Sequence, residues 1–445
     1  MTSPGTPLFA VRGDIAGLGE RARSLLLDRR FTPDAALRDR VAVIIKRVVD
    51  DGDEALRALA RELDGVELEQ LEVPREACAR ALDALDPALR RVMQRAADNI
   101  ARVHGAIPIA AIEIESEPGI TVGRRPDPLA RVGVYAPGGR APYPSSVLMG
   151  VIPARMAGVR EVVLCSPPRK ESGRLPEVVL AAAALTGVDR VFAVGGAGAI
   201  AAMAYGTPTI PPTDLIVGPG NAYVAAAKRY VRDVVATDAP AGPSELLVIA
   251  DESADPDVVA REMLAQAEHD PDTCVACVAV GGASLEAIEA ALRARLTDLP
   301  RASTIKAALA ARGALVTAAS IEEALGFAEA FAPEHLLLAA KGAGALLARV
   351  RNAGTVFVGE SSSVTFGDYM TGANHVLPTS GLARCYSGLS TLDFVRWTTY
   401  QRVSPAAAQR LAGDVAAFAE TESLTAHAEA ARAWDVATVA AEVGT

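Results

Sequence analysis

The apolar residues of the chain form two patterns that alternate along most of its length. Short runs rich in Val, Ile and Leu end in glycine or proline turns, and segments with apolar residues at helical spacing follow them. Such runs are typical of buried parallel strands, and the segments between them are typical of helices that cover a sheet. The alternation predicts an α/β fold with two doubly wound, Rossmann-like sheets.

The first sheet is expected between residues 132 and 231, and the second between residues 258 and 359. In the first, we expect strands at 132–137, 161–168, 190–196 and 214–220, with helices at 145–157, 175–185, 199–205 and 222–231. In the second, we expect helices at 258–269, 285–296, 321–331 and 343–350, with strands at 273–280, 313–319, 335–340 and 354–359. Ligands of a doubly wound sheet bind beyond the carboxyl ends of its strands.

The regions outside these sheets are predicted to be mostly helical. Residues 16–63, 77–85 and 87–103 have helical spacing, a β-like stretch follows at 107–122, and two helices are expected after Ser404. We therefore expect small helical regions at both ends of the chain. The predicted parts are a helical arm at 1–28, one α/β domain built from 29–131 and 246–387, a second α/β domain at 132–245, and a helical C-terminal domain at 388–445.

Composition narrows the class of function. Half of the 445 residues are apolar, so the chain can bury large cores, and its formal net charge of −10 argues against a nucleic acid partner. No apolar run is long enough to span a membrane. An odd number of cysteines, in a chain without a secretory leader, indicates a cytoplasmic protein.

Cys274 and Cys277 form a CxxC motif inside a predicted strand. Residues three apart in a strand point to opposite faces, so we favour two buried thiols over a metal or redox pair.

Three glycine-containing turns follow the strands of the first sheet, at 137–146, 195–201 and 218–221. Each leaves backbone amides free at a helix start, which suits a diphosphate. The segment from Gly196 to Ala201 fits a relaxed GxGxxA pattern, but Asp214 precedes the next strand instead of ending it. A packing glycine is the alternative for this turn alone, and the three turns together favour a nucleotide site.

Four of the five histidines have an acid or amide nearby in sequence, which suggests a composite metal or acid/base site. The pairs are Gln266 with His269, Glu334 with His335, Asp368 with His375, and Glu422 with His427. Asp368 and His375 are expected in a glycine-broken loop. For any one histidine, a hydrogen-bonded core residue is the alternative, and Gln266 with His269 could be a polar last helical turn.

Seven motifs occur in order across nearly the whole chain: VGVYAPGG, DLIVGPGNAYV, PAGPSE, QAEHDPD, FAPEHL, GDYMTGANHVLPT and LTAH. In this combination the chain resembles the histidinol dehydrogenase family. The motifs are long, so the resemblance is specific. It implies oxidation of L-histidinol to L-histidine through L-histidinaldehyde with two NAD in succession, in the last steps of histidine biosynthesis.

The resemblance also implies site residues. One zinc ion per subunit would be bound by Gln266, His269, Asp368 and His427, a set of nitrogen and oxygen donors that suits zinc. Ser244, His375 and Glu422 match positions that contact substrate. The full substrate-binding set implied is Ser244, Gln266, His269, Glu334, His335, Asp368, His375, Glu422 and His427.

In the reaction implied, His335 takes the alcohol proton while hydride leaves to NAD, and Glu334 then activates water on the aldehyde. The domain at 132–245 would bind NAD, and the other α/β domain would hold zinc. Tyr135 and Asn221 match family NAD contacts, whereas Gly198 stands where the family commonly has Gln. This departure predicts weaker NAD affinity with unchanged chemistry.

The resemblance further implies a homodimer in which the C-terminal domain of one subunit completes the active site of the other. Three alternatives are a related zinc and NAD dehydrogenase acting on another small amino alcohol or polyol, a zinc hydrolase with Glu334 as general base, and an inactive homologue. Manganese could replace zinc in the cell.

Overall fold

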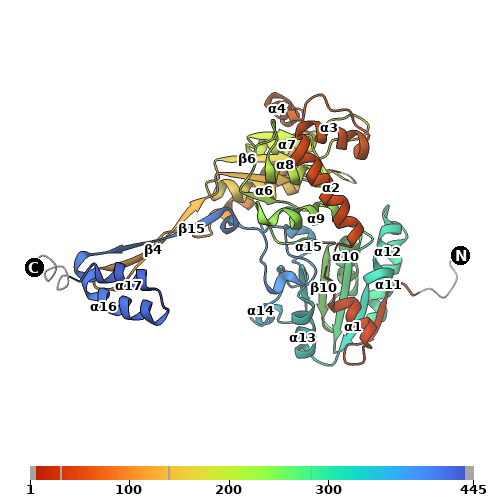
Figure 1. Cartoon of the computed structure of the whole chain (residues 1–445). Helices are drawn as coiled ribbons and strands as arrows, with labels where there is room; N and C mark the ends of the chain where they lie inside the picture. Colours follow the sequence, from red (N-terminus) through yellow and green to blue (C-terminus); the bar gives the residue numbers. More distant parts are fainter. Residues whose placement is uncertain (1–6, 31–32, 139–140, 282, 436–445) are drawn as a thin grey trace, which may run out of the picture. The chain divides into compact units, whose positions relative to one another are not determined.

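A computed structural model describes residues 7–30, 33–138, 141–281 and 283–435 (Figure 1). The chain divides into two compact units. The first combines the residues up to Ile107 with Leu129–Phe394, and the second combines Pro108–Pro128 with the residues from Val395 onward. The first unit contains two six-stranded sheets, named sheet I and sheet II below, which confirms the predicted α/β fold.

Sheet I has the strand order β2-β7-β6-β5-β8-β9. Its strands are β2 (Glu72–Val73), β5 (Arg131–Tyr135), β6 (Glu161–Cys165), β7 (Arg190–Phe192), β8 (Leu215–Val217) and β9 (Ala236–Thr237). All neighbours are parallel except β2, which runs antiparallel to β7. The strand order departs in both directions from β5, so the carboxyl ends of β5 and β8 form a topological switch point.

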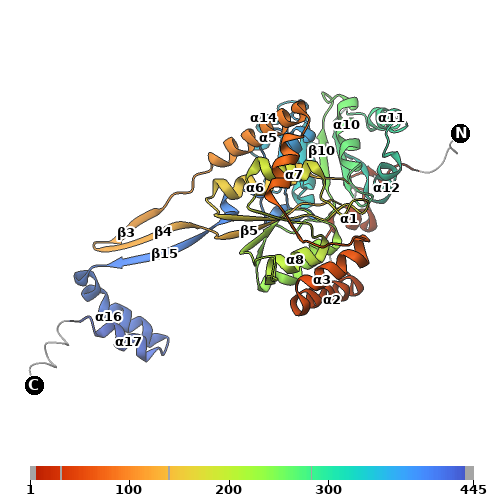
Figure 2. The same ribbon diagram turned by 90° about the horizontal axis from the view of Figure 1, so that it is seen from above.

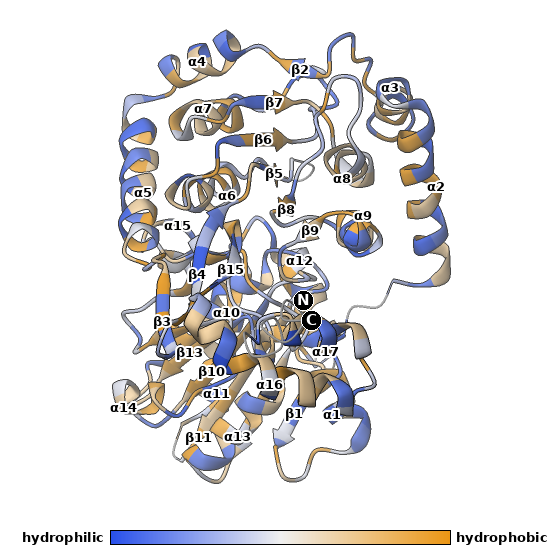
Figure 3. Ribbon diagram, turned by 60° about the vertical axis from the view of Figure 1, so that its left-hand side comes forward, coloured by the Kyte–Doolittle hydropathy of each residue, from blue (hydrophilic) through white to orange (hydrophobic). Residues whose placement is uncertain are grey.

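Two layers of helix cover each face of sheet I (Figure 3). On one face α6 (Pro144–Met156) and α7 (Glu177–Thr186) lie under α5 (Pro87–Gly105) and α4 (Arg75–Asp83). On the other, α8 (Gly196–Tyr205) and α9 (Ala222–Tyr230) lie under α2 (Ala35–Asp51) and α3 (Asp53–Leu59). The inner helices α7 and α8 are almost entirely apolar, because sheet and outer helix bury them from both sides. A π-helical turn, Ala60–Asp64, follows α3, and a 3-10 helix, Val231–Asp233, follows α9.

Sheet II is parallel throughout, with the order β1-β12-β11-β10-β13-β14. Its strands are β1 (Val11–Asp14), β10 (Glu245–Ala250), β11 (Cys274–Val280), β12 (Ala314–Ala318), β13 (His335–Ala339) and β14 (Thr355–Val358). One face packs on α10 (Pro256–Ala267), α11 (Leu285–Leu296), α12 (Ala302–Arg312) and α15 (Val364–Tyr369). The other packs on α1 (Glu20–Leu27), α13 (Ile321–Phe331) and α14 (Ala343–Leu347). Two 3-10 helices, Leu382–Arg384 and Thr391–Phe394, complete the first unit.

The second unit contains a three-stranded antiparallel sheet and a helical hairpin (Figure 2). The strands are β3 (Ile112–Glu117), β4 (Ile120–Pro128) and β15 (Val395–Val403), with β4 in the middle. The helices α16 (Pro405–Thr421) and α17 (Thr425–Arg432) pack through alanines. Small side chains let the two helices approach closely.

Several sequence-based expectations are wrong at the level of elements. β1 lies in the predicted helical arm, β15 lies in the predicted helical C-terminal domain, and α12 is an additional helix. β1 and β15 pair with β12 and β4, which are remote in sequence, so a local pattern does not identify them. Asp368 lies in α15 and not in a loop. Gly367 does not break this helix; a Cβ there would lie 2.7 Å from the Phe357 ring, so the glycine permits close packing.

The CxxC prediction is confirmed. Cys274 and Cys277 are buried on opposite faces of β11, and burial raises the pKa of each thiol to about 12. Neither thiol is therefore reactive near neutral pH. In the part of the chain that the structure describes, no helix has both the length and the apolar character needed to cross a membrane.

Candidate active site

Glu334 and His335 lie at the amino end of β13 and are buried, with 6% and 4% of their surface exposed. A Glu334 carboxylate oxygen accepts a hydrogen bond of 2.7 Å from the backbone N–H of Glu245. His335 Nδ1 lies 3.0 Å from the backbone carbonyl oxygen of the same residue. A carbonyl oxygen can only accept, so Nδ1 carries a hydrogen and Nε2 is the atom left for chemistry.

Asp368 and His375 lie beside this pair. The Asp368 carboxylate is 3.8 Å from His335 Nε2, and the Asp368 backbone carbonyl accepts a 3.0 Å hydrogen bond from His375 Nδ1. His375 Nε2 is 3.5 Å from the hydroxyl of Ser146, at the start of α6. The amino end of sheet II therefore meets the carboxyl end of sheet I at this place. The sequence predicted all of these acids and imidazoles as site residues, and the structure brings them together.

The two imidazoles differ in charge. Burial opposes the positive charge on His335, but the carboxylates of Glu334 and Asp368 outweigh it and raise the pKa of His335 to about 9. For His375 burial dominates, and it lowers the pKa although Asp368 acts in the opposite direction. At neutral pH these shifts favour the protonated form of His335 and the neutral form of His375.

Gln266 and His269 lie at the end of α10, which contacts α15. Gln266 is 2% exposed, and its Nε2 atom is buried without a hydrogen-bond partner among the described residues. Because amide nitrogen and oxygen are nearly indistinguishable, either end of this group could face a ligand. His269 is exposed. A buried amide normally has a hydrogen-bond partner, so the unpartnered amide of Gln266, on a helix that contacts the Asp368-bearing α15, fits a metal ligand.

Within the described ranges, no three side chains of the His, Cys, Asp and Glu types converge as a metal site. The predicted zinc set is of a different kind, since it includes an amide and takes His427 from the second unit. His427 lies on α17 and Glu422 at the end of α16, and both are exposed. The roles assigned to these residues stay predictions.

The predicted NAD residues surround the turns after β5, β7 and β8. Tyr135 ends β5, is 3% exposed, and accepts a 3.1 Å hydrogen bond on its hydroxyl from the backbone N–H of Gly196. Burial raises the pKa of Tyr135 to about 12. Asn221 caps α9, because its side-chain oxygen accepts from two backbone N–H groups in the first turn. Of the predicted turn at 137–146, residues 139 and 140 lie outside the described residues.

The loop from Gly218 to Asn221 is held by a buried ion pair. Lys228 donates to Asp238 at 2.6 Å and to the Gly218 carbonyl at 2.5 Å, and Asp238 accepts from the Gly218 N–H at 2.7 Å. Both main-chain groups of Gly218 are therefore fixed at the switch point of sheet I.

Gly198 lies inside α8 and is buried. A Cβ at this position would lie 3.3 Å from a Leu59 methyl group and 3.4 Å from a Leu56 methyl group, both on α3. The missing side chain lets α3 pack closely on α8, which supports the packing alternative for this glycine.

The sequence reasoning missed two residues of the site. Ser146 gave no signal, since the serines of the segment PYPSS look alike. Glu245 did give one: a carboxylate directly before the apolar run LLVIA is expected to be buried with partners, because a lone buried charge is costly. Its backbone bonds both Glu334 and His335.

The comparisons with known proteins point to one family. The model of the histidinol dehydrogenase family matches residues 27–434. A histidinol dehydrogenase of Methanosarcina barkeri is 46% identical over 393 residues, covering 88% of this chain and 90% of its own. One of Halobacterium salinarum is 48% identical over 416 residues, covering 93% and 96%.

A crystal structure of histidinol dehydrogenase from Elizabethkingia anophelis has a TM-score of 0.91 with this chain, at 34% identity, and covers 97% of this chain and 98% of its own. The similarity extends over both sheets and nearly the whole sequence. The chain therefore belongs to the histidinol dehydrogenase family of oxidoreductases.

Proposed function

We propose that the chain oxidises L-histidinol to L-histidine through L-histidinaldehyde, with two NAD in succession and one zinc ion per subunit. Beyond the family membership, one observation carries the proposal: a buried carboxylate and imidazole, Glu334 and His335, both bond the backbone of Glu245, and His335 lies beside Asp368 where the two sheets meet. The pair provides two groups that can exchange protons beside the glycine turns of sheet I.

The metal ligands proposed are Gln266, His269, Asp368 and His427. The buried, unpartnered amide of Gln266 supports this choice. All four side chains offer nitrogen or oxygen donors, which suit zinc. When bound, a divalent cation here would hold the substrate nitrogens and, through Asp368, would oppose protonation of His335.

In the first oxidation, His335 accepts the hydroxyl proton of the substrate on Nε2 while hydride passes from the carbinol carbon to the nicotinamide. The Nδ1–H bond to the Glu245 carbonyl keeps Nε2 directed outward and stabilises the charged ring. Since the pKa of His335 is about 9 without metal, the base role requires the ring to lose a proton first.

In the second oxidation, Glu334 activates the water that adds to the aldehyde. Its carboxylate is held by the Glu245 N–H and is only 8% exposed, so little bulk water competes for it. The hydrate then loses a second hydride to a new NAD, with His335 again taking the proton. Ser244 and His375 would contact the substrate nearby.

For NAD, we propose contacts at Tyr135 and Asn221, beside the fixed Gly218 loop. Gly198 would contribute by close packing of α8, and the lower NAD affinity predicted from its missing side chain remains to be tested. Glu422 and His427 would come from the second unit of a partner subunit in a homodimer, so that each active site needs both chains.

The test measures NADH formation with L-histidinol, together with bound zinc. We expect two NADH per histidinol, loss of activity after chelation, and recovery with zinc. His335→Asn should bind zinc normally and turn over far more slowly. If this variant loses its metal, the division between base and ligand is wrong, and if wild-type enzyme reduces no NAD with histidinol, the proposed reaction is wrong.

A further inference from the structure

The backbone of Glu245 joins both proposed catalytic residues. Its N–H donates to Glu334 at 2.7 Å, and its carbonyl accepts from His335 Nδ1 at 3.0 Å. These two groups belong to the consecutive peptides on either side of the Glu245 Cα, so a movement of this residue changes the carboxylate and the imidazole together. In addition to the strand pairing of β10, the Glu245 side chain holds the residue in place.

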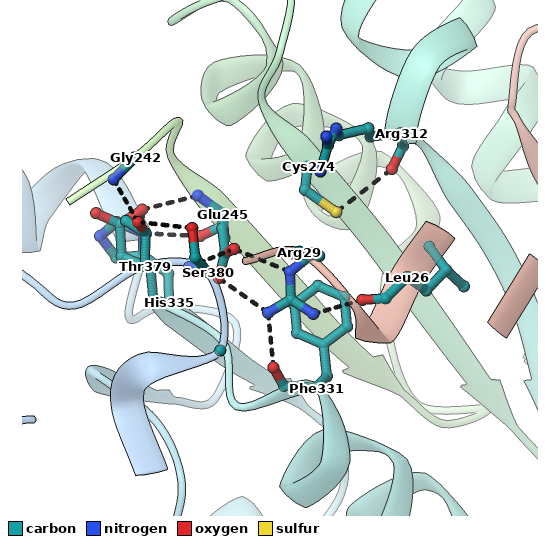
Figure 4. A network of polar contacts seen from close by, with 12 residues as sticks. Leu26, Arg29, Gly242, Glu245, Cys274, Arg312, Phe331, His335, Thr379 and Ser380 are labelled. Carbon is teal, nitrogen blue, oxygen red and sulfur yellow. Dashed lines mark hydrogen bonds and ion pairs between the residues drawn. The ribbon is translucent and has the colours of Figure 1, made fainter. Parts of the chain in front are cut away.

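That side chain lies in a buried network whose members come from distant parts of the chain (Figure 4). The Glu245 carboxylate accepts two hydrogen bonds from Arg29, at 2.9 and 3.1 Å, and a third, at 2.8 Å, from the backbone N–H of Ser380. Arg29 and Glu245 are 5% and 2% exposed. Both carboxylate oxygens are thus occupied, and the planar guanidinium fixes their orientation.

Arg29 is itself fixed by further contacts. It donates to the backbone carbonyls of Leu26 and Phe331, and its guanidinium carbon lies 3.5 Å from the centre of the Phe331 ring. Leu26 belongs to α1, and Phe331 ends α13, four residues before His335. The network therefore connects both strands that begin at the site to the end of α1.

The backbone around the network is strained. Ala332 and Ser380 adopt positive φ angles of 48° and 61°, and they are two of the three non-glycine residues with positive φ in the described chain. Such conformations persist only where surrounding contacts determine them. Here Arg29 binds the carbonyl just before Ala332, and Glu245 binds the N–H of Ser380.

We propose that Arg29 and Glu245 are positioning residues for the reaction: their buried ion pair fixes the backbone of Glu245 and thereby orients His335 and Glu334. The inference rests on the proposed function of those two residues. Neither Arg29 nor the Glu245 carboxylate needs to touch substrate, because both act through the backbone of Glu245.

The experiment compares Arg29→Met, Glu245→Gln and the double variant Arg29→Met/Glu245→Met with wild type. Loss of such supporting contacts typically costs about 10- to 100-fold in activity. We expect kcat to fall by this factor in all three variants, while bound zinc and the KM values for histidinol and NAD stay unchanged. The double variant leaves no lone buried charge, so it keeps the test decisive if a single variant fails to fold.

Arg155→Met is the matched control. Arg155 also binds a carboxylate, Asp189 at 2.5 Å, and several backbone carbonyls, but it lies where the strands of sheet I begin, at the opposite edge from the site. We expect it to lower the thermal midpoint and to keep kcat. Wild-type kcat in the folded double variant, or an equal loss of kcat in Arg155→Met, would overturn the proposal.

A second readout is independent of turnover. The imidazole Nδ1–H of His335, hydrogen-bonded to a carbonyl, should give a downfield proton resonance that His335→Asn removes. We expect this resonance to shift in Arg29→Met and to stay in place in Arg155→Met. An unchanged resonance in Arg29→Met refutes positioning, whereas a shift in a chain that does not oxidise histidinol would refute only the proposed reaction.

Discussion

At the scale of single residues, the chain buries polar groups where it needs defined chemistry and gives most of them a partner. Glu334 and His335 both bond the backbone of Glu245, so their orientations are interdependent. Among the described residues, three buried groups differ from this pattern: the hydroxyl of Ser166, the amide of Gln266, which is a proposed metal ligand, and the imidazole of His104 on α5.

His104 should make stability depend on pH. It is 3% exposed, neither ring nitrogen has a partner among the described residues, and burial lowers its pKa below the usual 6.5. The unfolded chain therefore binds the proton first, so stability is complete above about pH 6.5 and is lost as the pH falls below it, by at most about 1.4 kcal/mol per pH unit.

The check is denaturant unfolding between pH 7.5 and 5.5. His104→Leu should lose less stability over this range than wild type, whereas Met93→Leu, on the same helix, should follow the wild-type course. Parallel curves for His104→Leu and wild type would contradict the prediction.

Gly198→Gln should destabilise the protein, and it tests separately whether the missing side chain weakens NAD binding. The first side-chain atom would meet Leu56 and Leu59 at 3.3–3.4 Å, and overpacking of this kind costs about 1–3 kcal/mol. The measurement is the free energy of unfolding together with the KM for NAD. Gly198→Ala should give a smaller loss. Unchanged stability in Gly198→Gln would contradict the packing role, and a lower KM for NAD in this variant would support the predicted contact with NAD.

At the scale of elements, the site depends on where strands and helices begin and end. The glycine turns of sheet I lie at carboxyl ends, as its doubly wound order predicts, whereas Glu245 and His335 lie at amino ends in sheet II. The loop before α9 is positioned by Lys228 and Asp238, both beyond the GPGN sequence.

Lys228→Met should cost about 3–5 kcal/mol of unfolding free energy, because it leaves the Asp238 carboxylate buried and unpaired. Burial already raises the pKa of Asp238 although Lys228 opposes the shift. Lys228→Met/Asp238→Leu should recover much of the loss, and the KM for NAD should rise in both variants. A double variant no more stable than the single one would show that the ion pair is not the cause.

At the scale of the whole molecule, the two compact units divide the proposed site residues between them: His427 and Glu422 belong to the second unit, and the rest belong to the first. The proposal that a partner supplies the second unit makes a quantitative prediction.

Subunit mixing tests this arrangement. Glu334→Gln and His427→Asn should each be inactive as homodimers. After the two are unfolded and refolded together, each heterodimer has one site with both substitutions and one with neither, so about a quarter of wild-type activity should return. If one chain supplies a whole site, mixing restores nothing.

The sequence by itself determined the α/β class, the order of most strands and helices, and the family, because apolar periodicity and long motifs are local properties of the chain. It also named the acids and histidines that converge, since their residue types limit their chemistry. It did not determine β1, β15, the helical place of Asp368 or the packing role of Gly198, because each depends on a segment remote in sequence. The tertiary structure alone brought Arg29 to Glu245, since a buried charge is tolerable only where folding supplies its partner.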